Sequence, residues 1–538
     1  NDLFQQLKNR LIKTLEKALP NRKLVVTTYL LLTLVLAGIA FASIGKDLLP
    51  RTNNGQFQMR VKLPDGTRLE RTEDAVKKVL AIVDSTVSGH VDITSAYVGL
   101  VPSSYGTSNL YAFNTGTHEA IIQVHLDDDY KINMDELKDA LRKNIAHDIP
   151  DLRINFEPVD LTEKIMSQGA NNPIEVRVAG KNMEQIEGFA DTLTEKLKKI
   201  KYLRDVQIAQ PLHMPVINIK LDRLKIAQLG LNIKDVSNSV TAATSSSRFV
   251  EKNLWLDEHA AYTYQVQVQV PTYEMNSVEE LKEIPLIKGK NRPNLGDVAT
   301  FEMTTAPGEY DRAGPRRYLT VAANVNNKDL GTATGAVEQQ IKSMGQPPRG
   351  VKVEVRGMSS LLNETLADLQ KGLLFAILVI LLLLAANYES FKLALTVVTT
   401  VPAVILGSLL LLFLTGSTLN LQSYMGMIMS TGVSVANAIL IVTNAENLRL
   451  SMKDAHKAAV TSASIRLRPI LMTSLAMVVG MIPMASGMGE AGEQTAPLGR
   501  AVIGGLIAST LAALFVLPLV YAWVQENTDY KNSSLMPE

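Results

Sequence analysis

Long apolar segments constrain this chain more than any other feature of its sequence. Leu24–Ile44 contains no charged residue and has about the twenty-residue length that a helix needs to cross a bilayer. Five similar segments follow: Gly372–Asn387, Leu393–Leu414, Tyr424–Thr443, Pro469–Ser486 and Ala501–Val524. The sequence therefore predicts about six transmembrane helices, one at 24–44 and five within 363–524.

The positions of lysine and arginine predict the orientation of these helices. An even number of spans places both termini on one side of the membrane. The flanks on that side carry Lys8, Arg10, Lys13, Arg22, Lys23, Arg449, Lys453, Lys457, Arg466 and Arg468. The opposite loops Gly416–Leu421 and Gly487–Thr495 carry none. The positive-inside rule thus predicts cytoplasmic termini, including a tail at 525–538, and an inner-membrane protein with its soluble block in the periplasm.

The first 20 residues predict a helix of another kind. Leucines and Phe4 recur on one helical face, and lysines and Arg10 lie elsewhere, which is typical of a helix on the cytoplasmic membrane surface. The chain begins with Asn1, and no signal peptide precedes the first span. We therefore expect a fragment, or a processed or split product.

The soluble block between the first two spans predicts a mixed fold. Residues 46–170 have the order strand–helix–strand–strand–helix–strand of a ferredoxin-like unit. The order begins again in 171–214 and is completed in 306–358. The insert at 215–305 is long enough to be a domain. The predicted fold class is an α+β membrane protein with two βαββαβ subdomains, the second interrupted by the insert.

Composition excludes several classes of function. The net charge of +1 gives no support for a nucleic-acid partner. The sequence has no cysteine for a thiolate site, and no P-loop for ATP. Glu119 and Asp127–Asp129 are typical of a solvated rim, not of an acid–base pair. We expect neither enzymatic activity nor a bound cofactor.

Three membrane-proximal motifs carry a resemblance to a known family. They are A-A-N-Y-E-S-F at Ala385–Phe391, A-N-A-I-L-I-V at Ala436–Val442 and R-L-R-P-I-L-M-T-S-L-A at Arg466–Ala476. With one span, a large soluble block and five further spans, the whole chain resembles the C-terminal half of a resistance-nodulation-division (RND) permease. The resemblance implies two porter subdomains, the second split by a docking subdomain at 215–305. It also implies a trimeric pump driven by the proton gradient, with a periplasmic adaptor and an outer-membrane channel as partners.

The chain departs from the family pattern in two ways. RND permeases usually have two homologous halves, and this sequence holds one. Many drug exporters have a lysine before the asparagine of the A-N-A-I-L motif, where this chain has Ala436. No acidic or basic residue lies deep in a predicted span, and Ser, Thr and Asn do not titrate in the range a proton carrier needs. We expect the membrane carboxylates to come from a homologous N-terminal half.

The resemblance places three polar residues near the proton relay. Ser434, Asn437 and Thr473 are expected to hydrogen bond to the carboxylates of the other half. The alternative is that they only hold helices together.

The resemblance also suggests substrate contacts. Gly99–His118 resembles the switch loop beside the substrate cleft, where an apolar ligand is expected to meet Tyr105, Leu110, Tyr111 and Phe113. Alternatively, the loop packs its own aromatic side chains.

Methionines suggest a different substrate. Met59, Met166 and Met214 are candidates for a thioether site for Cu(I) or Ag(I), although methionine more often fills gaps in a core. The favoured function is proton-driven export of hydrophobic or amphiphilic compounds. The alternatives are a metal-ion exporter and a scaffold or sensor that does not transport.

Overall fold

The structure is a computed structural model that describes residues 2–50, 55–100, 113–130, 132–159, 161–167, 169–259, 262–286, 292–488 and 492–526. Its contacts divide the chain into two units, and each is described by itself. The first unit comprises 1–209 and 310–538, and the second comprises 210–309.

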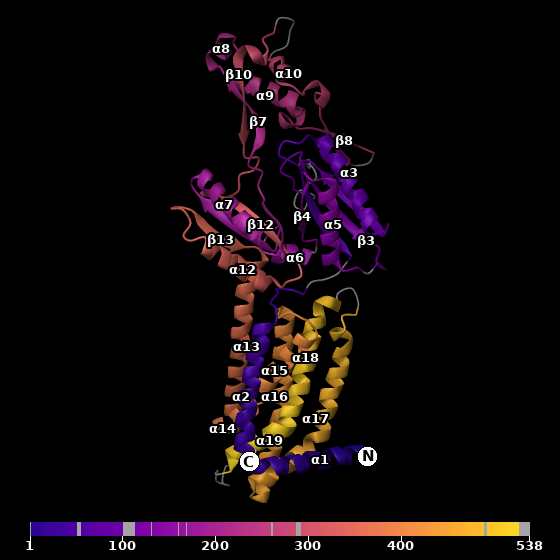
Figure 1. The fold of residues 1–538 in the computed structure, drawn as a ribbon, viewed down its shortest axis with the longest axis vertical. Helices are drawn as coiled ribbons and strands as arrows, with labels where there is room; N and C mark the ends of the chain where they lie inside the picture. Colours follow the sequence, from indigo (N-terminus) through magenta and orange to yellow (C-terminus); the bar gives the residue numbers. More distant parts are fainter. Residues whose placement is uncertain are drawn as a thin grey trace. The chain divides into compact units, whose positions relative to one another are not determined.

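Within the described residues of the first unit, six helical stretches are long and apolar enough to cross a membrane, as the sequence predicts. They run side by side in Figure 1. Their helices are α2 (Arg22–Ser43), α13 (Met358–Tyr388), α14 (Phe391–Val398) with α15 (Val401–Leu414), α16 (Leu421–Met452), α17 (Ala455–Ala485), and α18 (Gly492–Leu511), which continues through a π-helical turn (Ala512–Val516) into α19 (Leu517–Gln525).

Small residues allow the central membrane helices to approach closely. A Cβ atom on Gly407 of α15 or on Gly504 of α18 would overlap the carbonyl oxygen of the other glycine. On Gly426 of α16, a Cβ atom would lie 2.7 Å from the carbonyl oxygen of Leu498 in α18. Such contacts take the place of hydrophobic burial as the driving force for helix association in lipid.

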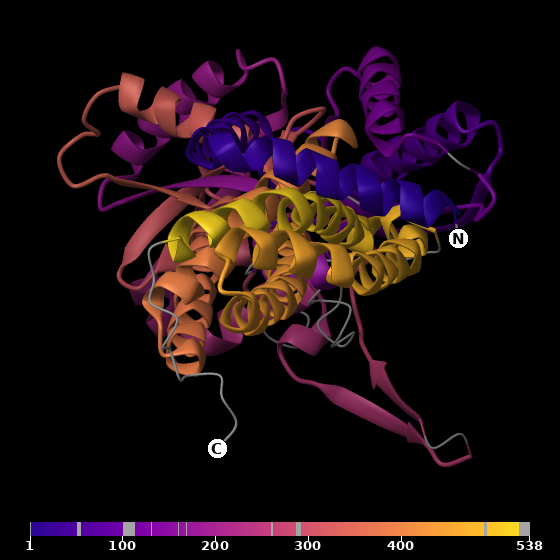
Figure 2. The same ribbon diagram turned by 90° about the horizontal axis from the view of Figure 1, so that it is seen from below.

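The amphipathic segment at the N-terminus is helical, and part of its apolar face packs on the chain itself. Helix α1 (Asp2–Ala18) lies across the end of the bundle (Figures 1 and 2). Leu11 and Leu15 are buried in the same apolar core as residues of α16, α17 and α19. A short 3-10 turn at Leu19–Asn21, with Pro20 inside it, joins α1 to α2. The bundle therefore covers Leu11 and Leu15, whereas Leu7 on the same face is exposed, and the position of α1 at the membrane surface stays a prediction.

The first soluble sheet has the predicted order of elements. Its strands are β1 (Gln56–Lys62), β2 (Val91–Val98), β3 (Glu119–Leu126) and β4 (Arg153–Glu157), arranged β2-β3-β1-β4 and antiparallel. Helices α3 (Leu69–Thr86) and α5 (Met134–Asp148) follow β1 and β3. Alternate residues of β1 (Phe57, Met59 and Val61) are buried in one core with the apolar residues of both helices. The intervening Gln58 and Arg60 must face the other side of the sheet.

The second soluble sheet joins distant parts of the sequence. Its order is β11-β12-β5-β13, and β6 also pairs with β12. The strands are β5 (Ile174–Gly180), β6 (Leu203–Ile208), β11 (Arg312–Ala313), β12 (Arg316–Val325) and β13 (Lys352–Arg356). The helices are α6 (Leu161–Met166), which precedes β5, with α7 (Met183–Leu197) and α12 (Leu330–Ser343).

The second unit contains the predicted insert. Strands β7 (Met214–Leu221) and β10 (Ala299–Ala306) pair, and β8 (Asn253–Asp257) pairs with β9 (Tyr262–Val266) as a separate hairpin. Its helices are α8 (Arg223–Gln228), α9 (Ile233–Thr244), α10 (Val278–Lys282) and α11 (Leu295–Val298), with 3-10 turns at Ser247–Phe249 and Thr272–Glu274. A small core that includes Ile226, Val236 and Leu295 holds the β7–β10 end together.

The close approach of α15 and α18 generates a prediction. Gly504→Ala forces these helices apart and is expected to destabilise the intact permease by about 1–3 kcal/mol, the usual cost of overpacking. Gly372→Ala is the control, because a Cβ atom there meets nothing within 4 Å and alanine favours the helix. Thermal unfolding in detergent measures both. Equal midpoints for the two variants would show that the contact does not limit stability.

Candidate functional site

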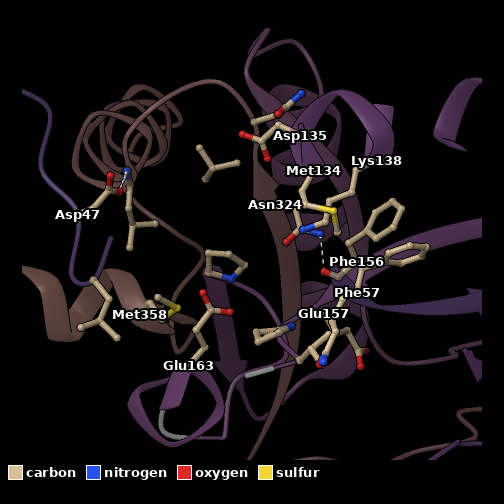
Figure 3. A pocket seen from close by; sticks show the side chains of 18 of the residues that line it. Asp47, Phe57, Met134, Asp135, Lys138, Phe156, Glu157, Glu163, Asn324 and Met358 are labelled. Carbon is tan, nitrogen blue, oxygen red and sulfur yellow. Dashed lines mark hydrogen bonds between the residues drawn. The ribbon is translucent and has the colours of Figure 1, made fainter. Parts of the chain in front are cut away.

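A cavity of about 880 Å³ lies between the two soluble sheets of the first unit (Figure 3). Its walls come from β1, α5, β4, β12, the start of α13 and the segment that follows α2. The side chains labelled in Figure 3 are Asp47, Phe57, Met134, Asp135, Lys138, Phe156, Glu157, Glu163, Asn324 and Met358. The cavity therefore presents carboxylates, amides and thioethers beside two phenyl rings.

The start of helix α5 builds one wall of this cavity. The side chain of Asn133 caps the helix by accepting a 3.0 Å hydrogen bond from the backbone N–H of Asp135. Met134, Lys138 and Arg142 are spaced four residues apart, so they share one helical face, and all three line the cavity. The cap and the helical period together place a carboxylate, a thioether and two cations on this wall.

Arg142 connects the wall to the second sheet. Its Nε and Nη2 donate to the two carboxylate oxygens of Asp205 on β6 at 2.8 and 2.7 Å. Its guanidinium lies 4.7 Å from the ring centre of Phe156. Burial opposes the charge, but the hydrogen bonds and charge of Asp205 raise the pKa of Arg142 above its ordinary value. The cation is thus held by the protein rather than offered to a ligand.

Amide side chains close the same side of the cavity. Asn324 Nδ2 donates to Asp205 Oδ2 at 2.8 Å and to the Phe156 carbonyl at 2.8 Å. Asn172 and Asn155 exchange hydrogen bonds at 2.7 and 3.1 Å between the two subdomains. These contacts join the subdomains through polar groups that have partners inside the protein.

A buried cluster of charges lies behind the cavity wall. Arg60 Nε donates to Glu157 Oε1 at 2.5 Å, and Lys62 Nζ lies 2.6 Å from Glu119 Oε1. Glu119 is fully buried, so its assignment to a solvated rim is wrong. Although burial alone opposes ionisation, Lys62 and Arg60 lower the pKa of Glu119 to about 2. The alternation of Gln58, Arg60 and Lys62 along β1 is the sequence signal that sequence reasoning overlooked.

A histidine completes this cluster. His118 is 1% exposed, and its Nε2 lies 3.6 Å from Glu119 Oε1 and 3.7 Å from Asp65 Oδ1. Burial lowers the pKa of His118 despite these carboxylates. Among the described residues, no three histidine, aspartate or glutamate side chains are arranged to hold a metal ion.

The residues predicted to contact an apolar substrate do not line this cavity where the structure describes them. Tyr105, Leu110 and Tyr111 lie outside the described residues. The side chain of Phe113 is 58% exposed, and its carbonyl accepts a 2.8 Å hydrogen bond from Arg60. Arg60 thus anchors the end of the predicted switch loop.

Two of the candidate methionines, Met59 and Met166, lie on opposite sides of the first soluble sheet. Met59 is fully buried in the core on the helical side of the first sheet. Met166 lies on α6, where Lys164 donates to Gln58 on the opposite side of that sheet at 3.2 Å. Met214 lies in the second unit. For Met59, the alternative of core packing is the better description.

The three predicted relay neighbours do not share one environment. Ser434 is buried, and its hydroxyl donates to Thr400 Oγ1 at 3.3 Å within this chain. Asn437 is buried on the same side of α16. Thr473 is exposed on α17 and bonds to the carbonyls of Pro469 and Ile470 in its own helix. Ser434 therefore faces its own bundle, and Thr473 faces outward.

The exposed face of α16 is apolar and includes two small residues, Gly432 and Ala436. Met425, Met429, Gly432, Ala436 and Leu440 recur along it at helical spacing. A Cβ atom on Gly432 would meet nothing within 4 Å. Gly432 and Ala436 form a small-x-x-x-small pair, a pattern that lets another helix approach closely.

Two charged residues lie in the last turns of α16. Helix α16 extends to Met452, beyond the span predicted to end at Thr443. Glu446 and Arg449 are buried and paired through Arg449 Nη2 and Glu446 Oε1 at 2.6 Å. Tyr521 of α19 donates to Glu446 Oε2 at 2.5 Å. Both charges therefore have partners inside this chain.

Comparisons with known proteins cover nearly the whole chain. The cobalt-zinc-cadmium resistance protein CzcA of Cupriavidus metallidurans is 27% identical over 97% of this chain and 49% of its own length. The cation efflux system protein CzcA of Alcaligenes sp. is 27% identical over the same shares. The crystal structure of a heavy metal efflux pump superposes with a TM-score of 0.83 at 25% identity, covering 98% of this chain and 52% of that one.

The chain thus spans about half the length of the relatives it matches. The family model described as the AcrB/AcrD/AcrF family matches residues 1–525. This chain therefore belongs to the AcrB/AcrD/AcrF family of RND permeases.

Proposed function

We propose that this chain is one half of a proton-driven RND permease that exports divalent transition-metal cations. Sequence reasoning favoured hydrophobic or amphiphilic compounds. The relatives named for cobalt, zinc and cadmium favour the metal-ion alternative instead. The single observation that carries the proposal is the chemistry of the cavity between the two sheets.

Oxygen donors dominate the polar lining of this cavity. They belong to Asp47, Asn133, Asp135, Glu157, Glu163, Asn324 and Asn326. Carboxylate and carbonyl oxygens suit hard divalent cations, and carboxylates also bind Zn²⁺, whereas Cu(I) is selected by soft sulfur ligands. Two thioethers, Met134 and Met358, are present beside these oxygens. The lining therefore fits a divalent cation such as Zn²⁺ better than a purely apolar drug.

A transport site must also release its cargo. Binding that is strong enough for entry but weak and distributed enough for exit is the general requirement for conduction. A cavity with scattered oxygen donors meets this requirement. The scattered donors also agree with the finding that no tight three-ligand cluster exists among the described residues.

The missing half is proposed to pack on the exposed face of α16. The chain spans about half of its relatives, and Ala436 points to the outside of this bundle. Gly432 beside it leaves room for a helix backbone. A carboxylate-bearing helix there would lie next to the motif that the family resemblance links to the proton relay. Thr473 also faces outward and is the one proposed relay neighbour available to a partner.

We extend the proposal to the whole assembly. The two soluble sheets act as ferredoxin-like porter subdomains in the periplasm, and both termini are cytoplasmic. The exposed apolar side chains of hairpin β8–β9 support self-association, consistent with a trimer: Leu254, Trp255, Leu256, Tyr262 and Tyr264. The periplasmic adaptor and the outer-membrane channel belong to the same proposal.

Neutralising the cavity carboxylates tests the substrate. The double substitution Asp135→Asn and Glu163→Gln removes two charged oxygen ligands from the cavity. An interaction with a charged group contributes about 1.5–3 kcal/mol. The complete permease is therefore expected to transport Zn²⁺ at least tenfold more slowly. Uptake into proteoliposomes with an imposed pH gradient measures it.

The matched control is Asp128→Asn, because the side chain of Asp128 is 94% exposed and lies outside the cavity lining. The proposal would be contradicted if the double variant kept its Zn²⁺ transport and Phe113→Ala lost the export of an apolar dye. The substrate would then be an apolar compound. A native permease that moves neither class would favour the scaffold alternative.

Cross-linking tests the position of the other half. The sequence contains no cysteine, so single cysteines in this chain are unambiguous. Ala436→Cys is expected to cross-link to the other half, whereas Ala438→Cys, which is fully buried on another face of α16, is not. Peptide mapping after proteolysis identifies the linked helix. Free reaction of Ala436→Cys with a lipid-soluble maleimide in the assembled permease would instead place this face against lipid.

A further inference from the structure

Gly45–Leu48, four residues shortly after the end of α2, form a segment that we call the strap. On one side the strap pairs with the turn between α15 and α16. Asp47 N–H donates to the Leu419 carbonyl at 3.0 Å, and Leu419 N–H donates to the Gly45 carbonyl at 2.8 Å. These bonds form a short parallel bridge between Lys46 and Leu419. The strap is therefore bound by its backbone to the membrane region.

On the other side, the strap holds the first turn of α12, the helix between β12 and β13 of the second sheet. Leu330 N–H donates to Asp47 Oδ1 at 2.8 Å, and Gly331 N–H donates to the Lys46 carbonyl at 2.8 Å. Asp329 accepts from Lys46 N–H at 2.9 Å and from Thr332 N–H at 2.8 Å. The N-terminal donors of a helix have no partners within the helix. Here the strap and one capping aspartate supply the partners for three of them.

The strap and the first turn of α12 are in close van der Waals contact. A Cβ atom on Gly45 would lie 2.7 Å from Cβ of Asp329, and one on Gly331 would lie 2.9 Å from Cβ of Lys46. Asp47, Leu48 and Leu419 are all buried. Separation of α12 from the strap would leave buried donors without partners, which is unfavourable. The hydrogen bonds between the strap and α12 are therefore expected to form or break together.

Asp47 also lies at the boundary between two cavities. It lines the cavity between the soluble sheets and a second one of about 530 Å³, whose other walls include Ser417, Asp329 and Arg500. The second cavity lies at the ends of α15, α16 and α18, where Arg500 donates to Ser417 Oγ at 2.6 Å. The strap thus separates the proposed substrate cavity from the end of the membrane bundle.

We propose that the strap is a mechanical link that makes α12 and the α15–α16 turn move as one body. A shift of α15 and α16 on proton binding is then transmitted to the second sheet and to the cavity wall that contains Asn324. Asp47 acts as the positioning residue of this link. The inference rests on the proposed transport function for its purpose, but the link itself is testable without it. Coupling of two sites requires such a shared element with two states.

Distance measurement between two spin labels tests the link in the complete permease. The labels are placed at Gln339→Cys on α12 and Thr415→Cys at the α15–α16 turn, two positions that are exposed. The expected result is one narrow distance distribution that does not change with pH or Zn²⁺. A native distance that shifts with either would overturn the proposal, because the two elements would then move separately.

Two pairs of variants show whether the strap causes this behaviour. Gly331→Ala is expected to broaden the distribution, whereas Gly335→Ala on the same helix, where a Cβ atom meets nothing within 4 Å, leaves it narrow. Asp47→Ala is expected to broaden it, and Asp47→Asn, which keeps an acceptor for Leu330 N–H, is expected to restore it. Narrow distributions in both Gly331→Ala and Asp47→Ala would overturn the assignment of the link to the strap.

A binding measurement separates this inference from the proposed function. In Gly331→Ala, the effect of pH on Zn²⁺ affinity is expected to fall roughly tenfold relative to Gly335→Ala, within the usual range of coupling free energies. If the native permease binds no Zn²⁺, the proposed substrate is wrong and the label distances still decide the link. If Zn²⁺ binds and the pH effect is equal in both variants, the link does not carry the coupling.

Discussion

The carboxylate of Asp205 connects the two halves of the soluble region in the first unit. It accepts two hydrogen bonds from Arg142 and one each from Asn324 and the backbone N–H of Phe156. These donors come from both sheets. Asp205 has a φ of 54°, in the left-handed region that costs a non-glycine residue energy. The four hydrogen bonds to Asp205 stabilise this backbone conformation. The same hydrogen bonds connect α5, β4 and β12, which form walls of the cavity.

Close helix packing and one internal ion pair hold the membrane region together. Glycines bring α15, α16 and α18 together, and the charges of Glu446 and Arg449 neutralise one another inside the bundle. One face of α16 is left apolar, small and uncovered within this chain. The chain spans about half the length of the relatives it matches, and we propose that another part of the permease covers this face. The proposed coupling has two steps. Protons bind at the interface on the exposed face of α16, and the strap transmits the resulting helix movement to the second soluble sheet.

Several features of the site are not evident from the sequence, for one shared reason. The period of α16 places Ser434, Asn437 and Ala436 around a helix, but it does not say which face other helices cover. Ser434 proved to bond with Thr400, and Ala436 proved to be exposed. In β1, alternation separates Met59 from Arg60, but the partners of each lie far away in the sequence. The polar lining of the cavity is equally hidden in the sequence, because it comes from segments as distant as Asp47, Glu163 and Asn324.

The sequence by itself determined the membrane spans, the order of helices and strands, and the family resemblance. These follow from local properties: the length of apolar segments, the period of apolar residues and short motifs. Only the tertiary structure decided which charges are paired, which face of α16 is exposed and which residues surround the cavity. It also decided that the strap meets α12, nearly three hundred residues later in the chain. Such contacts depend on packing between distant segments, and no local pattern in the sequence encodes them.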